Sequence, residues 1–251
     1  MKAKRNKKRW AYAAIAIFLI TTLSGALMLS GILRINNPSR EQYPIWGVDV
    51  SEYQGSIDWH ILSDEGIRFA FIKATEGSSY QDPAFAANWQ GSADAGVPAG
   101  AYHFFSFESP ASTQAQNLFS ALQSRPDMLP PVVDIELYGK FKQTPPQADA
   151  VREQLQILLT AIEEQYGQTP ILYTTQRTYR LYLQTGFEQY PLWMREVYWG
   201  APSQNWTFWQ YSDVAKLSGY AGPEKRIDLN VFAGDEAAWQ TFRAENAPPA
   251  P

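Results

Sequence analysis

The strongest constraint on the fold of this chain is an alternation of strand-like and helix-like segments along its sequence. Eight short segments are rich in aromatic and β-branched residues and are bounded by Gly, Pro, Ser or Asp, a pattern typical of β-strands. The first five are each followed by a helical pattern, whereas the last three are joined by loops alone. The predicted strands are 46–51, 69–74, 100–107, 132–137, 170–174, 191–195, 207–211 and 227–232.

The clearest helical pattern runs over 145–166, with Thr144 as the expected N-cap and Pro145 in the first turn. Its apolar residues recur at the period of a helix that covers a sheet. Further helices are predicted at 57–64, 83–95, 109–122 and 176–184. Strands that alternate with helices predict a parallel sheet, and eight of them favour a closed α/β barrel of the TIM type. The missing late helices predict an incomplete outer ring.

The N-terminus has the composition of a membrane segment. Residues 1–10 hold six of the 21 basic residues and no acid, and residues 11–33 follow as 23 positions without a charge. About 20 apolar residues cross a bilayer, and basic residues before them stay cytoplasmic. We therefore expect a transmembrane signal anchor at 11–33, in a single-pass cell-membrane protein whose globular domain lies outside the cytoplasm, on the periplasmic or cell-wall side. The alternative is a signal peptide cleaved near 24–26, which would leave a secreted protein.

The rest of the chain is interpreted as a short polar linker at 34–44, one domain at 45–243 and a Pro/Ala-rich tail at 244–251. Outside the basic N-terminus, 15 basic residues stand against 25 acidic ones, a net charge of −10. Such an acidic body argues against nucleic acid as a partner. The chain has no cysteine and only two histidines, so it has no thiolate chemistry and a histidine-rich metal site is not expected. We expect no cofactor and a monomer.

Two carboxylates interrupt the apolar segment PPVVDIEL at 130–137. Because alternate residues of a strand face opposite sides, Asp134 and Glu136 share one face. A buried acid is costly unless it has a partner or a function. The carboxyl ends of barrel strands line the active-site mouth, so Glu136 is expected at the mouth and Asp134 one layer below.

Asp49 in the first predicted strand and Asp228 in the last are expected to approach each other, because these strands are neighbours in a closed barrel. Crowded carboxylates raise one another's pKa, so that one stays protonated near neutral pH. A proton donor beside ionised carboxylates is what glycoside cleavage needs. Two alternatives stay open: Asp134 could brace Lys73 or a backbone amide, and the acids could hold Mg²⁺ or Ca²⁺.

Aromatic residues on the predicted strands are candidates for stacking on the flat faces of sugar rings. Each of them is also a candidate core residue, because aromatic side chains fill protein interiors. His103 is expected to face the opposite side of its strand from Tyr102, toward packing. The candidate substrate contacts are Tyr102, Phe105, Tyr173, Trp193 and Trp209.

Several of these motifs, in this order, resemble those of glycoside hydrolase family 25, the Chalaropsis-type lysozymes or N-acetylmuramidases. The resemblance spans about residues 46–232, and its most specific part is the combination of DVS-x-x-QG-x-IDW with DIE. The segments are GVDVSEYQGSIDW, FAFIKATEGSSYQDP, GAYHFFSF, PPVVDIE, ILYTT, YPLWM, WTFWQYSD and RIDLNVF.

The resemblance implies a flattened (β/α)5(β)3 barrel that hydrolyses the β-1,4 bond between N-acetylmuramic acid and N-acetylglucosamine in the glycan strands of peptidoglycan. Glu136 would then be the proton donor, and Asp134, Asp49 and Asp228 would complete the carboxylate cluster. Either a water molecule or the substrate's own acetamido group could attack. The chain departs from the family directly after Trp193-Met194. It carries the charged pair Arg195 and Glu196 there, where members often carry a small residue.

Two other functions are compatible with these observations. One is a scaffold that binds glycan without cleaving it, which the presence of all four acids disfavours. The other is a hydrolase of a different glycan, such as chitin.

Overall fold

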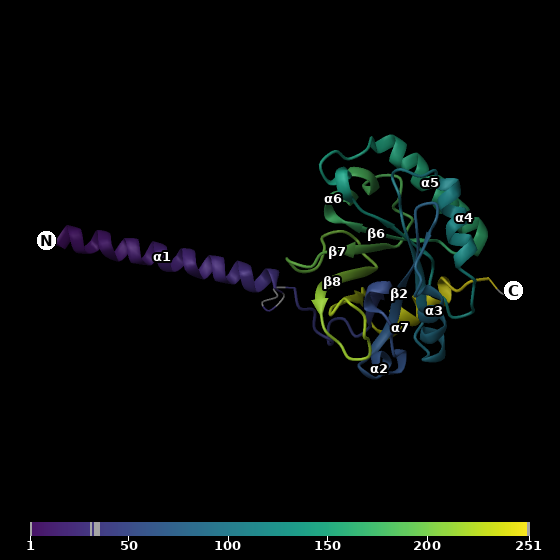
Figure 1. Cartoon of the computed structure of the whole chain (residues 1–251), viewed down its shortest axis with the longest axis horizontal. Coiled ribbons are helices and arrows are strands. Elements are labelled where there is room, and N and C mark those ends of the chain that lie inside the picture. The colour runs from purple at the N-terminus through teal and green to yellow at the C-terminus, as the bar shows by residue number, and fades with distance from the viewer. Residues whose placement is uncertain (1, 31, 33–35, 250–251) are drawn as a thin grey trace.

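The computed structural model describes residues 2–30, 32 and 36–249, in which a long N-terminal helix projects from a rounded α/β domain (Figure 1). The helix α1 (Lys2–Leu29) contains a stretch, Lys8–Leu29, that is long and apolar enough to cross a membrane and is not buried against the rest of the protein. The parts of the predicted anchor, linker and tail that fall on 31, 33–35 and 250–251 lie outside the described residues.

The domain is a closed barrel of eight strands, as the sequence predicts. The strand order β1-β9-β8-β7-β6-β5-β4-β2 is closed by pairing of β2 with β1, and the short β3 (Tyr80–Gln81) adds to the edge of β2. The eight strands are β1 (Trp46–Val50), β2 (Ile67–Glu76), β4 (Ala99–Phe104), β5 (Val132–Ile135), β6 (Ile171–Thr175), β7 (Leu192–Arg195), β8 (Phe208–Ala215) and β9 (Ile227–Phe232).

The expectation of an all-parallel sheet is wrong for one strand. β9 runs antiparallel to both of its neighbours, β8 and β1, whereas the other barrel pairs are parallel. The physical reason is the loop connection: without a crossover helix, β8 can return directly into β9, and a direct return gives an antiparallel pair. This reversal brings the N-terminal end of β9 to the barrel mouth.

The predicted helices are all present, with shifted ends. α2 (Trp59–Asp64), α3 (Phe85–Asp94), α4 (Ala111–Ala121) and α5 (Ala148–Tyr166) pack outside the barrel, and the last predicted helix is a short α6 (Gln176–Thr178) continued by a π-type turn, η3 (Tyr179–Leu183). Short 3-10 turns lie at η1 (Glu52–Gln54) and η2 (Gly139–Lys142).

Two of the shifted boundaries have a clear physical cause. α5 begins three residues after the predicted start, with Gln147 rather than Thr144 at its N-cap, because the second proline of Pro145-Pro146 disfavours helical geometry in the residue before it. β4 ends at Phe104 instead of 107. The backbone amides of Ser106 and Phe107 bond to side chains of Gln114 and Tyr138, at 2.7 and 3.1 Å, rather than to a strand.

A helix that the sequence reading missed closes the floor of the barrel. α7 (Glu236–Glu245) begins at Asp235, whose carboxylate accepts a hydrogen bond from the amide of Ala238 at 2.9 Å. Its residue Trp239 is 1% exposed and packs against Phe69 and Phe232, with ring centroids 5.6 and 5.2 Å apart. The helix therefore plugs the end of the barrel opposite to the mouth.

The core has two parts, separated by the sheet. The outer part lies between the strands and the surrounding helices, and the inner part fills the lower barrel with rings such as Phe71, Trp193 and Phe208. Gly47 points into this inner core, where an added Cβ would meet the ring of Phe69 at 2.4 Å. The floor is thus dry and filled, so the opening of the barrel lies at the other end.

We predict that Trp239→Ala lowers the free energy of unfolding by about 3–5 kcal/mol, the usual cost of removing a buried Trp or Phe side chain. Denaturant unfolding followed by circular dichroism measures the loss, and Glu245→Ala, an exposed position at the end of the same helix, is the control. An unchanged unfolding midpoint in Trp239→Ala would mean that the strand ladder alone holds the barrel closed.

Candidate active site

One open cavity of about 330 Å³ lies at the mouth of the barrel, and all four predicted acids line it. Asp49 comes from β1, Asp134 from β5 and Asp228 from β9, while Glu136 directly follows the end of β5. The remaining wall is made mainly of aromatic and amide side chains with a few charged ones. It includes Lys73, Tyr102, Phe104, Tyr173, Trp193, Gln210 and Asp213.

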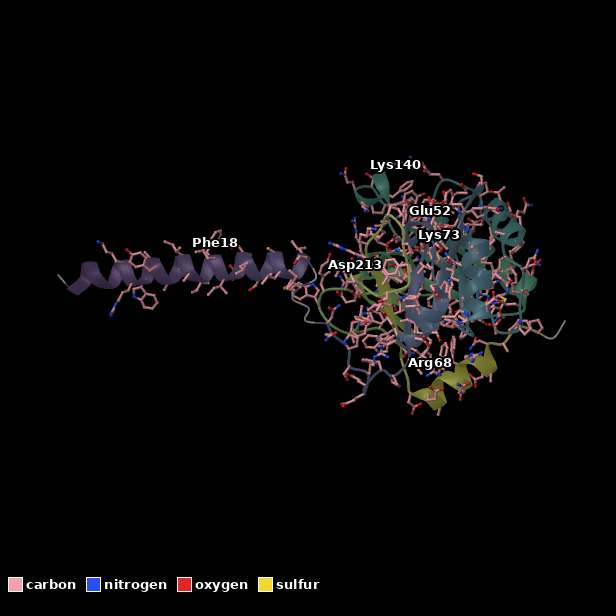
Figure 2. The ribbon with its side chains drawn as sticks, turned by 60° about the horizontal axis from the view of Figure 1, so that its bottom comes forward. Phe18, Glu52, Arg68, Lys73, Lys140 and Asp213 are labelled. Carbon is pink, nitrogen blue, oxygen red and sulfur yellow. The ribbon has the colours of Figure 1, made fainter. Side chains whose placement is uncertain are left out.

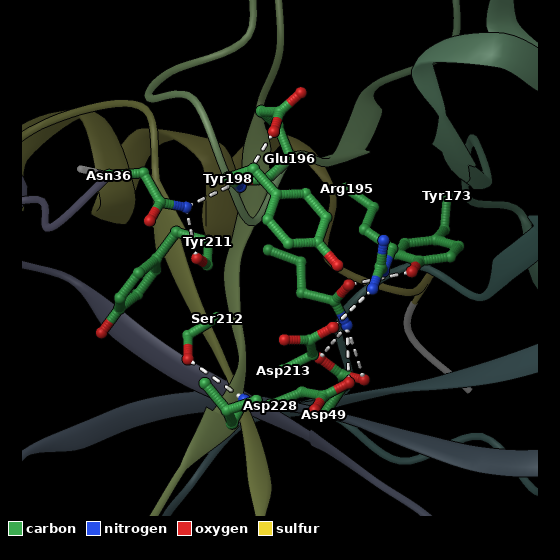
Figure 3. Close-up of polar contacts among 12 residues, drawn as sticks. Asn36, Asp49, Tyr173, Arg195, Glu196, Tyr198, Tyr211, Ser212, Asp213 and Asp228 are labelled. Carbon is green, nitrogen blue, oxygen red and sulfur yellow. Dashed lines mark hydrogen bonds and ion pairs between the residues drawn. The ribbon is translucent and has the colours of Figure 1, made fainter. Parts of the chain in front are cut away.

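Asp49 and Asp228 lie directly opposite each other on β1 and β9. The side-chain amide of Gln210 bridges them: its Nε2 donates to Asp49 Oδ2 at 3.0 Å and to Asp228 Oδ2 at 2.9 Å (Figure 3). Asn230 Nδ2 donates to Asp49 Oδ2 at 2.8 Å. Loss of water around the pair raises both pKa values, and the two carboxyl groups also hydrogen-bond each other. The pair therefore has the geometry to share one proton, held by Asp228, whose pKa is well above its ordinary value.

Two aromatic side chains fix the orientation of these amides. Tyr173 donates its hydroxyl to Gln210 Oε1 at 2.9 Å, and Trp193 donates its indole N–H to Asn230 Oδ1 at 2.8 Å. Because each amide oxygen is occupied by a donor, each NH2 group is turned toward the carboxylates. Tyr173 and Trp193 also line the cavity, so both stay candidate sugar contacts in addition to holding these amides.

The second pair of acids, Asp134 and Glu136, has fewer partners. Asp134 Oδ1 has no hydrogen-bond partner among the described residues, and burial together with the nearby Glu136 raises the pKa of Asp134 well above its usual range. Burial also raises the pKa of Glu136, while the positive charge of Arg195 opposes this shift. Lys73, considered as a brace for Asp134, instead pairs with Glu76 at 2.8 Å. A carboxyl group that holds its proton near the pocket rim can act as an acid.

Arg195, at the end of β7, forms an ion pair with Asp213. Its Nη2 lies 2.6 Å from Asp213 Oδ2, and both side chains are about one-third exposed (Figure 3). Asp213 lines the cavity, and Arg195 is its ionic partner. Sequence reasoning missed Gln210, Asn230 and Asp213. Asn230 could have been predicted from the sequence, because it stands two residues after Asp228 and therefore lies on the same face of the strand.

The structure corrects two predicted sugar contacts. Phe105 and Trp209 are 1% and 2% exposed and belong to the outer core, away from the cavity. Trp209 donates its indole N–H to the carbonyl of Glu196 at 2.7 Å. Strand alternation explains both cases, because their neighbours Phe104 and Gln210 face the mouth. Tyr102 lines the cavity and stays a candidate sugar contact.

His103 points outward, as the sequence predicts. It is buried between Thr75 Oγ1, 2.7 Å from Nδ1, and Gln114 Oε1, 3.0 Å from Nε2. Burial lowers its pKa to about 4, so the ring is neutral at physiological pH. Within the part of the chain that the structure describes, no three His, Cys, Asp or Glu side chains are grouped as metal ligands.

Comparison with known proteins places these residues in a wider context. The family model described as glycosyl hydrolases family 25 matches residues 48–220. The uncharacterized protein YegX of Escherichia coli K12 is 38% identical over 80% of this chain and 74% of its own length. Lysozyme M1 of Streptomyces globisporus is 32% identical over 77% of this chain and 69% of its own length. The structure of a family 25 glycosyl hydrolase from Bacillus anthracis superposes with a TM-score of 0.77 at 42% identity, covering 82% of this chain and 96% of that one.

We predict that Asp134→Asn raises the thermal midpoint at pH 7 by a few degrees. Burial and Glu136 raise the pKa of Asp134 in the folded state. Below the unfolded-state pKa of about 4 the carboxyl group is protonated in both states and costs no stability. As the pH rises above that value, the group ionises more readily in the unfolded state, and the free energy of unfolding falls. The gain should therefore shrink as the pH is lowered toward 4. Thermal scans at both pH values measure it, with exposed Asp64→Asn as the control. An equal gain at both pH values would show that the effect is not electrostatic.

Proposed function

The chain belongs to glycosyl hydrolase family 25, and on this basis we propose that it is a muramidase in which Glu136 donates the proton to the departing sugar. Its substrate is then the β-1,4 bond between N-acetylmuramic acid and N-acetylglucosamine in peptidoglycan. The observation that carries the proposal is the meeting of Asp134, Glu136, Asp49 and Asp228 in one open pocket with aromatic walls. General acid catalysis needs a protonated group at the mouth, and the raised pKa of Glu136 supplies one.

The other acids have different roles in this mechanism. Asp134, one layer below Glu136, orients the attacking group and, once it is ionised, stabilises positive charge that develops on the sugar. Its buried Oδ1 has no hydrogen-bond partner among the described residues, so no protein donor neutralises that charge. Asp49 and Asp228, held by amides, form the opposite wall and bind sugar hydroxyl or acetamido groups. Direct attack by water inverts the anomeric carbon and attack by the acetamido group retains it, so the configuration of the first product, read by NMR, distinguishes the two routes.

The enzyme acts outside the cytoplasm, either secreted or attached to the membrane. We favour attachment through α1, because its basic N-terminal flank and its apolar length are those of a signal anchor. Detection of Lys8–Leu29 peptides in the mature protein by mass spectrometry tests this choice, and their absence would show that the leader is removed.

We predict that Glu136→Gln reduces hydrolysis of purified peptidoglycan by at least ~10²-fold, since this is the usual contribution of a general acid. The release of new reducing ends measures the rate, and mass spectrometry of the products should find muramic acid at those ends. Glu164→Gln, at an exposed position on α5, is the matched control. Undiminished cleavage by a correctly folded Glu136→Gln variant would rule out the assignment, and products with only N-acetylglucosamine at the new ends would show that the other glycosidic bond of the strand is cleaved, which contradicts a muramidase.

The charge of Arg195 should appear in the pH dependence of the reaction. Arg195 lowers the pKa of Glu136, so Arg195→Met should raise that pKa and move the alkaline limb of kcat/KM to higher pH. Arg195→Met alone leaves the carboxylate of Asp213 without its ionic partner, so the double variant Arg195→Met/Asp213→Asn removes both charges and should move the alkaline limb in the same direction. Arg180→Met, at an exposed position, is the control. An alkaline limb that stays in place or moves to lower pH would contradict the assignment of Glu136 as the acid.

A further inference from the structure

The turn after β7 presents two aromatic side chains to solvent. Tyr198 and Trp199 are 40% and 73% exposed, and Trp199 has the highest value among the large apolar residues of the described barrel. The turn is ordered by Glu196, whose Oε1 accepts the backbone amides of Tyr198 at 2.9 Å and Trp199 at 3.2 Å. Single exposed aromatic side chains are common on protein surfaces, so exposure alone does not indicate a binding surface. The position of Tyr198 and Trp199 in the molecule is the stronger observation.

The pair lies where the chain leaves α1. Asn36 is buried, and its Nδ2 donates to the backbone carbonyls of Glu196 at 3.2 Å and Tyr211 at 2.6 Å (Figure 3). Only residues 30–35 separate Asn36 from Leu29, the end of α1, and so short a segment spans at most about 20–25 Å. Any membrane that contains α1 is therefore close to the turn that Glu196 begins.

A cavity that α1 shares with the barrel supports this placement. Met28 and Leu29 of α1 line one small cavity of about 130 Å³ together with Tyr198. The loop after β7 projects from the barrel toward the end of α1 (Figure 1). Tyr198 is thus at the level at which the apolar helix emerges, and Trp199 is its neighbour in sequence.

We propose that Tyr198 and Trp199 insert into the interfacial layer of the lipid bilayer and act as a second contact of the barrel with the membrane. The proposal rests on the retained anchor of the proposed function. Trp and Tyr concentrate at this depth because each has an apolar body and a polar tip. A sugar chain in the catalytic pocket is not the occupant that the geometry favours, because neither residue lines that pocket.

The contact fixes where the enzyme can work. Asp213 and Arg226 line both the catalytic pocket and the cavity beside Tyr198, so the mouth opens next to the membrane-facing surface. Figure 2 shows Asp213 on the side of the barrel nearest to α1. With two points of attachment the barrel is oriented as well as tethered. Its substrate is the glycan that lies against the membrane rather than the outer layers of the wall.

The natural absence of cysteine allows a clean test. Ala201→Cys, exposed beside Trp199, carries an environment-sensitive NBD label in the full-length chain, reconstituted in phosphatidylglycerol/phosphatidylethanolamine nanodiscs. Glu164→Cys, on α5 at the far side of the barrel from α1, carries the same label as a control (Figure 1). We expect doxyl-labelled lipids to quench the label at 201 and to leave the label at 164 unchanged.

The side chain itself is tested by Trp199→Ser in the Ala201→Cys background, which should lose most of the quenching while the nanodisc still holds the protein through α1. Equal quenching at 201 and 164 would overturn the proposal, and so would full quenching at 201 without Trp199. Both variants should cleave solubilised peptidoglycan fragments at the unmodified rate. Undiminished activity in Glu136→Gln would contradict only the proposed function and would leave the quenching result unaffected, so the two failures are distinguishable.

Discussion

The seam between β1 and β9 is the constraint on which the rest of the structure depends. Pairing of these strands closes the sheet and places Asp49 opposite Asp228. Because β9 is antiparallel, Asp228 near its N-terminal end lies at the mouth. A parallel β9 would have carried the same residue to the floor, among the aromatic rings. The direction of one strand thus decides whether two acids meet the substrate or disrupt the core.

The interior of the barrel is divided by polarity along its axis. The floor is filled by stacked aromatic side chains and covered by α7, and the mouth holds carboxyl groups whose pKa values are raised by loss of water. Trp193 joins the two parts, since its ring packs on Phe71 while its N–H fixes Asn230. The packed floor therefore gives the amides a rigid support. Their fixed NH2 groups keep the acids close together although mutual repulsion favours separation.

The same strands that hold the site also connect the barrel to its N-terminal segment. Asn36 bonds to the carbonyl of Glu196, directly after β7, and to that of Tyr211 inside β8. β7 carries Arg195 and β8 carries Asp213, the two partners of the ion pair. The described part of the expected linker, 36–44, packs against the barrel. Asn36 is buried, and Tyr43 packs on Trp206 and Trp209. From Asn36 onward, the described part of this segment is therefore fixed to the strands that form the mouth of the barrel.

The sequence by itself determined the eight strands, five of the surrounding helices, the apolar leader and the four acids, because each of these rests on local periodicity or on a motif. Alternation along 132–137 was enough to put Asp134 and Glu136 on one face. Only the tertiary structure decided the direction of β9, the plug formed by α7 and the bridging role of Gln210. The reason is physical: each of these depends on what a residue meets across the barrel, and partners 18 or 161 positions apart leave no periodic signal in the chain.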